Sequence, residues 1–245
     1  MDLWGIRNWS TAVQPYLVEH IYLAVIPTVV GVILAVPIGL ALHGRPAARS
    51  VAVVVSSAIF TIPSLALFVV LPGLIGTQVL DPLNVIIALS LYTLALSVRN
   101  TFEALDAVPQ VTREAAEAIG YSRLGRTAAV DLPLAVPVLT AGTRVVAVTN
   151  VSMVSVGAVI GIGGLGQLFT SGYQRNFPEQ ILTGMVLILI LAIIFDRLIA
   201  LLGRALTPWI RGSSMASSQR RLRRLAREIP GSASLREAAD APGGR

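Results

Sequence analysis

The residues best placed to act on a partner or a substrate lie between positions 111 and 133. Residues 113–120 read Arg-Glu-Ala-Ala-Glu-Ala-Ile-Gly, and after nine further residues 130–133 read Val-Asp-Leu-Pro. Residues 111–119 favour a helix, because Thr112 can cap its start and Gly120 can end it. The small side chains of Ala115 and Ala116 would let another protein surface approach closely. Such a helix suits docking to a separate subunit, and the alternative is an ordinary amphipathic connector.

A second pattern is formed by three glycines, Gly161, Gly163 and Gly166, which match G-x-G-x-x-G. As a dinucleotide-binding motif it needs a preceding strand, a following helix and an acidic residue about 20 positions later. Here a long apolar run precedes the glycines, Pro178 interrupts the segment after them, and no carboxylate lies near position 186. We therefore interpret the glycines as a tight external turn or a re-entrant segment.

Several residue types that carry chemistry in other proteins are missing from this chain. All 19 basic residues are arginine, so there is no lysine for a phosphate-binding P-loop. There is no cysteine, and the two histidines are His20 and His43. We expect no catalytic residues, no metal site and no cofactor site in this chain.

The elements that position these residues are predicted to be membrane-spanning helices. Of the 245 residues, 54% are hydrophobic and 13% charged, whereas a soluble domain usually has about 25% charged residues. A span needs about 20 mostly apolar residues. Five runs qualify, at 20–42, 51–71, 84–98, 134–160 and 181–202, the third being short and completed by Leu80 and Leu83. The sequence predicts an all-α membrane protein with about five transmembrane helices.

The arginines predict the orientation of these spans. One side would hold Arg45, Arg49, Arg99, Arg113, Arg123, Arg126, Arg204, Arg211 and the cluster Arg220, Arg221, Arg223, Arg224 and Arg227. The other side would hold Arg7 and Arg175. Because positive charge favours the cytoplasmic side, the N-terminus is predicted outside and the C-terminus in the cytoplasm. The first span lacks a basic start and is long, so we expect a retained helix, preceded by an interfacial aromatic group of Trp4, Trp9, Tyr16 and Tyr22.

Polar residues inside the fourth span are candidates for a transport pathway or gate. Arg144 should face the bundle interior, either in a structural or gating pair or along a pathway, because an arginine in the membrane is costly. Asn150 and Ser152, with Ser155, would form a polar stripe that either packs helices or lines a pore. Asp196 and its neighbour in the fifth span are expected at an exposed interfacial position.

The loop residues and four further segments resemble a known family. Glu-Ala-Ala, three residues, Gly, nine residues, an aliphatic residue, one residue and Leu-Pro is the signature loop of ABC importer permeases of the type I fold. Residues 61–67 (Thr-Ile-Pro-Ser-Leu-Ala-Leu), 98–101 (Val-Arg-Asn-Thr), 132–137 (Leu-Pro-Leu-Ala-Val-Pro) and 160–166 (Ile-Gly-Ile-Gly-Gly-Leu-Gly) are similar to segments of glycine betaine/carnitine/choline importer permeases. The resemblance covers about residues 15 to 210.

The resemblance implies a permease subunit that takes up osmoprotectants. Its partners would be cytoplasmic ATPase subunits, which carry ATP and Mg, a second permease copy or paralogue, an extracytoplasmic binding protein and membrane lipid, with no nucleic acid. Glu114, Ala115, Ala116 and Gly120 would form the element that couples the ATPase to the permease. Leu132 and Pro133 would set the exit from that loop into the fourth span. Since a quaternary ammonium prefers aromatic faces and only 6% of the chain is aromatic, we expect its main recognition in the binding protein.

Other functions stay open from the sequence alone. A permease for methionine or another small solute is the main alternative. An ion-coupled transporter would need ionisable groups near the midplane and inverted repeats, and an intramembrane enzyme would need a nucleophile with a base, or metal ligands.

We divide the chain into an extracytoplasmic segment (1–19), a permease domain (20–211) with its coupling loop at 99–133, and a basic cytoplasmic tail (212–245). Within that tail, residues 219–227 could form a short basic helix at the membrane surface.

Overall fold

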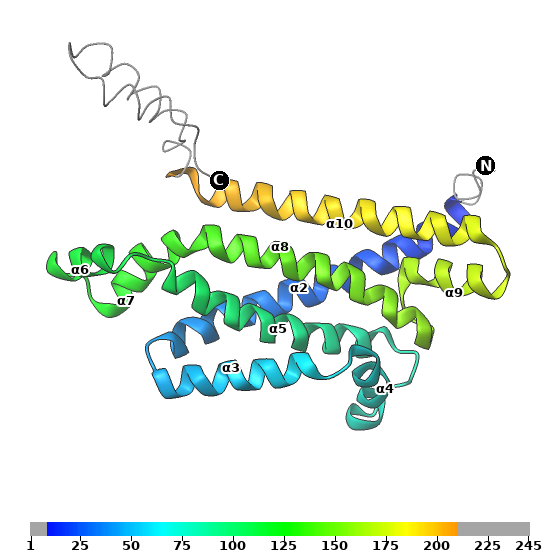
Figure 1. The fold of residues 1–245 in the computed structure, drawn as a ribbon, viewed down its shortest axis with the longest axis horizontal. Helices are drawn as coiled ribbons and strands as arrows, with labels where there is room; N and C mark the ends of the chain where they lie inside the picture. The colour runs from blue at the N-terminus through cyan, green and yellow to red at the C-terminus, as the bar shows by residue number, and fades with distance from the viewer. Residues whose placement is uncertain (1–8, 210–245) are drawn as a thin grey trace, which may run out of the picture. The chain divides into compact units, whose positions relative to one another are not determined.

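The computed structural model describes residues 9–209, and in that range it contains helices and turns without a β-strand. The predicted all-α fold is confirmed (Figure 1). The helices are α2 (Gln14–His43), α3 (Pro46–Thr61), α4 (Ser64–Ile75), α5 (Pro82–Asp106), α6 (Gln110–Ala118), α7 (Arg123–Arg126), α8 (Leu132–Gly157), α9 (Gln167–Gln174) and α10 (Pro178–Leu206). Short π turns at Trp9–Val13 and Thr127–Asp131, and 3-10 turns at Ala158–Ile160 and Gly164–Gly166, join them. The predicted basic tail, its possible helix at 219–227 and Trp4 lie outside the described residues.

Four of the described helices are long and apolar enough to cross a membrane: α2, α5, the helical stretch from Arg123 to Ile160, and α10. The bent pair of α3 and α4 brings the count to as many as five if it is one span. The third span is longer than the sequence indicated, because α5 continues to Asp106. Residues 99–106, which we assigned to the coupling loop, are therefore helical, and Arg99 lies inside a candidate span.

The second predicted span, 51–71, is not one continuous helix, because the chain breaks between α3 and α4 with a bend of 97°. Pro63 has no backbone N–H to donate, and its ring forces Ile62 into an extended conformation (φ −64°, ψ 128°). The hydroxyl of Tyr92 on α5 donates to the freed carbonyl of Ile62 at 2.5 Å. The break is thereby fixed from the neighbouring helix.

The bundle is organised around α5, with α2, α3 and α8 packed along it (Figure 1). Helices α2 and α5 approach closely because glycines face threonines. A Cβ added at Gly39 would lie 2.5 Å from Cγ2 of Thr101, and one added at Gly31 would overlap Thr93. The largest fully buried side chains of the main core include Leu23, Phe68, Tyr92, Val154 and Leu165.

The glycine pattern at 161–166 forms a tight turn that follows a helix, so the dinucleotide interpretation lacks its preceding strand. Gly161 has φ +90° and Gly164 has φ +47°, a region that favours glycine. A Cβ at Gly164 would lie 2.6 Å from the backbone nitrogen of His20. His20 is fully buried and its Nε2 donates to the carbonyl of Val151 at 2.9 Å, which joins α2, α8 and the turn.

Candidate functional site

The candidate docking helix is α6, which begins one residue earlier than predicted. Its first turn follows Pro109, whose fixed φ suits a helix start. Thr112 lies within the helix and no side chain caps it, so the predicted capping role of Thr112 is wrong. Gln110 Nε2 donates instead to Glu114 Oε1 at 3.1 Å, one turn along the surface.

Gly120 ends this helix as predicted. Its φ of +92° is left-handed, and the N–H of Gly120 donates to the Glu117 carbonyl at 3.0 Å. The N–H of Tyr121 donates to the Ala116 carbonyl at 3.1 Å, closing the last turn. A Cβ at Gly120 would meet nothing within 4 Å, so the glycine is required by the backbone and not by packing in this chain.

Three large apolar side chains in and next to α6 and α7 are exposed, and the sequence interpretation missed them. Val111, Ile119 and Leu124 are 76%, 77% and 85% exposed. Of the predicted docking residues, Glu114, Ala115 and Gly120 are exposed beside them, whereas Ala116 is buried against the permease body. Exposed apolar side chains of this size are typical of a contact surface where they form a patch. The signal in the sequence was the apolar residue at each end of 111–119.

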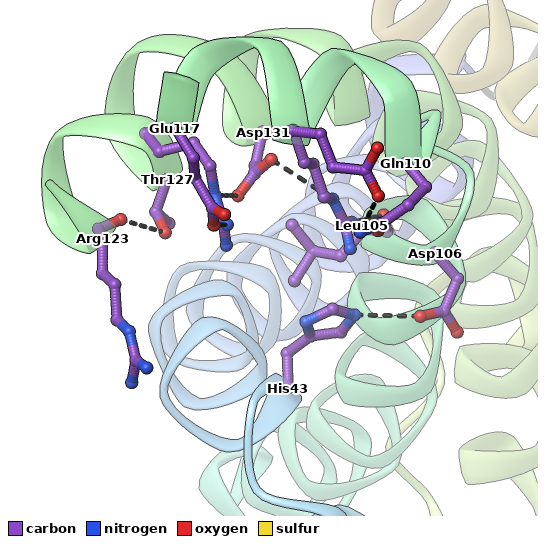
Figure 2. A network of polar contacts seen from close by, with 11 residues as sticks. His43, Leu105, Asp106, Gln110, Glu117, Arg123, Thr127 and Asp131 are labelled. Carbon is purple, nitrogen blue, oxygen red and sulfur yellow. Dashed lines mark hydrogen bonds and ion pairs between the residues drawn. The ribbon is translucent and has the colours of Figure 1, made fainter. Parts of the chain in front are cut away.

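The buried carboxylate of Asp131 holds the loop between α5 and α8 together. Asp131 lies 3.4 Å from Nε of Arg113 (Oδ1) and 3.2 Å from Nε of Arg126 (Oδ2). Arg126 also pairs with Glu117, and Arg113 donates to the carbonyl of Leu105 at the end of α5. Figure 2 shows Glu117 and Asp131 facing each other across this network. The network ties α6 both to the end of α5 and to the start of α8.

The loop passes into α8 without a break in helical structure. Ser122 caps α7 by accepting from the N–H of Gly125 at 3.2 Å, and Thr127 donates to the Arg123 carbonyl at 2.9 Å. The π turn Thr127–Asp131 then runs directly into α8, where Leu132 and Pro133 occupy the first turn, half-buried. Proline in the first turn costs no helical hydrogen bond.

A second polar group joins the helix ends next to this loop. Asp106, at the end of α5, accepts from His43 Nε2 at 2.9 Å and from Arg49 at 2.5 and 3.1 Å (Figure 2 shows the His43 contact). The Arg49 guanidinium also lies 5.2 Å from the ring centroid of Phe102. These contacts join α2, α3 and α5 at the same end of the bundle as α6.

Of the candidate pathway residues, Arg144 is in an ion pair. Its Nε and one terminal nitrogen donate to the two oxygens of Asp196 on α10 at 2.7 and 2.8 Å, a bidentate arrangement. The prediction of an exposed interfacial Asp196 is wrong, because this carboxylate neutralises Arg144 with its side chain 26% exposed. The pair joins α8 to α10, which supports the structural alternative for Arg144.

The structure does not bring Asn150 and Ser152 together. Asn150 is buried and its Nδ2 donates to Thr28 and to Thr93, each at 2.8 Å, so it ties α2, α5 and α8. Ser152 is exposed on a different side of α8. These two bonds support the helix-packing alternative for Asn150, whereas Ser152 is an exposed position. No group of three or more histidine or acidic side chains in residues 9–209 could hold a metal ion.

Comparison with known proteins identifies the family. Residues 28–212 match the family described as the inner membrane component of binding-protein-dependent transport systems. The chain belongs to this family. Two curated relatives agree with it. The osmoprotectant import permease protein OsmW of Salmonella typhimurium is 34% identical over 78% of this chain and 89% of its own length. The choline transport system permease protein OpuBB of Bacillus subtilis is 33% identical over 78% and 86%.

Solved structures confirm the fold of this inner membrane transport component. The MetNI methionine ABC transporter, in an inward-facing conformation, contains a chain that superimposes with a TM-score of 0.68 at 24% identity. The match covers 78% of this chain and 94% of that one. This likeness establishes the type I ABC importer permease fold of the helices described above.

Proposed function

We propose that this chain is the permease subunit of an ATP-driven importer for osmoprotectants such as glycine betaine, choline or carnitine. The observation that carries the proposal is the identity of 33–34% with permeases named for osmoprotectant import and for choline transport, over more than three quarters of the chain. Methionine or another small solute is the alternative. The methionine transporter shares the fold at 24% identity, which carries no argument about the solute.

The partners follow from the family and from the exposed face of the loop. A binding-protein-dependent system implies an extracytoplasmic binding protein that delivers the solute. We propose that a cytoplasmic ATPase, which binds ATP and Mg, docks on Val111, Ile119 and Leu124 beside Glu114 and Ala115. A second permease copy or paralogue would cover apolar surface that this chain leaves exposed on α3 and α10.

The proposed solute is tested by transport in vesicles. The permease, reconstituted with its ATPase, partner permease and binding protein, should take up radiolabelled glycine betaine or choline only when ATP is enclosed with the ATPase. A complex with an inactive ATPase is the control. ATP-driven uptake of methionine but of no quaternary amine would contradict the proposal.

The proposed orientation places α6 and Gly120 in the cytoplasm and the N-terminus outside. It rests on the arginine distribution in the sequence, since most of the arginines flank the predicted spans on the side of the loop 99–133. The chain has no cysteine, so a single introduced thiol reports its own position. Tyr121→Cys, half-exposed after α6, should react with an impermeant maleimide only after the membrane is opened. Reaction in sealed cells would reverse the orientation.

A further inference from the structure

Arg99 and Arg144 are two of the arginines inside the candidate spans of residues 9–209, and their surroundings differ. Arg144 on α8 is neutralised by Asp196. Arg99 on α5 is exposed, and in residues 9–209 no carboxylate lies within 4.0 Å of its guanidinium. It is seven residues before the end of α5, about 10 Å along the helix from Asp106. Lipid cannot solvate a guanidinium, so an arginine inside a span pairs with protein, reaches along its stem to the interface, or faces water.

The neighbour of Arg99 is Ser57 on α3. One terminal nitrogen of Arg99 donates to Ser57 Oγ at 3.5 Å, the outer limit of a hydrogen bond, while Ser57 Oγ donates to the Val53 carbonyl at 2.9 Å. A guanidinium carries five N–H donors in a planar fork that matches a carboxylate. Most of this donor capacity is therefore open to a ligand from outside the chain.

An aromatic ring lies one turn farther along the same face of α3. Phe60 is 43% exposed and packs edge-on against Tyr92, with ring centroids 6.0 Å apart and planes at 89°. Tyr92 itself is buried and bonded to the carbonyl of Ile62 at the break between α3 and α4. The non-helical backbone at that break is exposed, and such backbone at membrane depth is tolerated where it lines a water-filled cavity or is covered by protein.

We propose that Arg99, Ser57 and Phe60 form a site on the transport path for a compact zwitterion that carries a carboxylate and a quaternary ammonium. The carboxylate binds the Arg99 guanidinium, and the ammonium lies over the exposed ring of Phe60 through a cation–π contact. Ser57, which Arg99 contacts, and Phe60 are about one helical turn apart on α3. This spacing suits a molecule of the size of glycine betaine. This inference rests on the proposed function. It distinguishes the proposed solutes, because glycine betaine has a carboxylate for Arg99 to bind and choline has none.

The test compares the uptake of glycine betaine and of choline by the reconstituted complex. Each solute is supplied at a saturating concentration, so that the binding protein is fully loaded in both assays. In Arg99→Gln the ratio of glycine betaine uptake to choline uptake should fall by about tenfold, the effect of one lost charge-assisted contact. Arg99→Lys should retain most of the ratio. Phe60→Leu should slow the uptake of both solutes.

Two matched controls separate a local effect at this site from a general loss of transport. Glu103, one turn from Arg99 on α5, is the nearest carboxylate along the helix, and Glu103→Gln should leave the ratio unchanged. In single-cysteine variants, Ser57→Cys should react with a small charged thiosulfonate reagent, and saturating glycine betaine should slow the reaction. Val55→Cys is also exposed but lies about 200° around α3 from position 57, and it should react slowly because it lies among the exposed apolar side chains of Val51 and Val54.

Each contrary outcome overturns a different statement. An unchanged ratio in Arg99→Gln, or equal loss of both solutes, overturns the carboxylate site. Equal, slow labelling of Ser57→Cys and Val55→Cys overturns the water-filled path at Arg99. If the unaltered complex carries neither solute, the proposed function is wrong and the zwitterionic ligand with it.

Discussion

Replacing Gly120 with valine should abolish most of the ATP hydrolysis that solute stimulates, while the permease still inserts and assembles. Gly120 has φ +92°, which costs an L-residue about 1–2 kcal/mol and a β-branched one more. The loop would escape this strain by opening the last turn of α6, which displaces the exposed apolar face from its partner. Since allosteric coupling free energies of about 1–3 kcal/mol correspond to about 5- to 150-fold, we expect stimulated hydrolysis to fall by about tenfold or more.

The measurement is ATPase activity of the reconstituted complex with and without loaded binding protein. Gly120→Asn should retain most of the coupling, because asparagine tolerates a positive φ. Gly44→Val is a matched control, since Gly44 is also exposed with no atom near an added Cβ, but its φ is −78°. If loaded binding protein stimulates ATP hydrolysis normally in Gly120→Val, α6 does not couple the ATPase to the permease.

Substituting Asp131 with asparagine should loosen the whole loop between α5 and α8. The change removes the carboxylate that Arg113 and Arg126 share, while these side chains are only 16% and 22% exposed. Breaking a fully buried pair costs about 3–5 kcal/mol, and the partial exposure of both arginines lowers our expectation to about 2 kcal/mol. Amide hydrogen exchange in 110–131 should then accelerate by about tenfold or more, since about 1.4 kcal/mol is a factor of ten.

Asp106→Asn is the matched control for this prediction. Asp106 also faces two basic side chains, but its own side chain is 45% exposed, and an exposed pair contributes about 0–1 kcal/mol. The Asp106→Asn substitution should therefore change amide hydrogen exchange in residues 110–131 only slightly. Equal acceleration in both variants would mean that burial of Asp131 does not set the stability of the loop.

Much of the architecture was predictable because membrane-spanning helices appear in a sequence as long apolar runs. Four of the five predicted spans are long helices in the structure. Helices α2, α5 and α10 extend beyond both ends of their apolar runs, whereas α8 begins two residues before its run and ends at Gly157, three residues short of the predicted end. The hydrophobic signal stops at the first polar residues, so α5 was predicted to end near Val98, although hydrogen bonding continues to Asp106. Pro27 and Pro37 leave α2 unbroken, whereas Pro63 ends α3. At that break Tyr92 of the neighbouring helix satisfies the carbonyl of Ile62.

The spacing of the loop residues by itself determined the position of α6 and the stop at Gly120, since a left-handed stop needs glycine wherever the loop lies. Composition determined the membrane location and excluded a P-loop. Only the tertiary structure decided which polar residues pair: Arg144 with Asp196, Asn150 with Thr28 and Thr93, and Asp131 with two arginines. These partners are up to 122 positions apart in the chain. Their pairing depends on the rotation of each helix about its axis, and helix–helix packing sets that rotation. For the same reason, the sequence could not distinguish a neutralised arginine, Arg144, from an open one, Arg99.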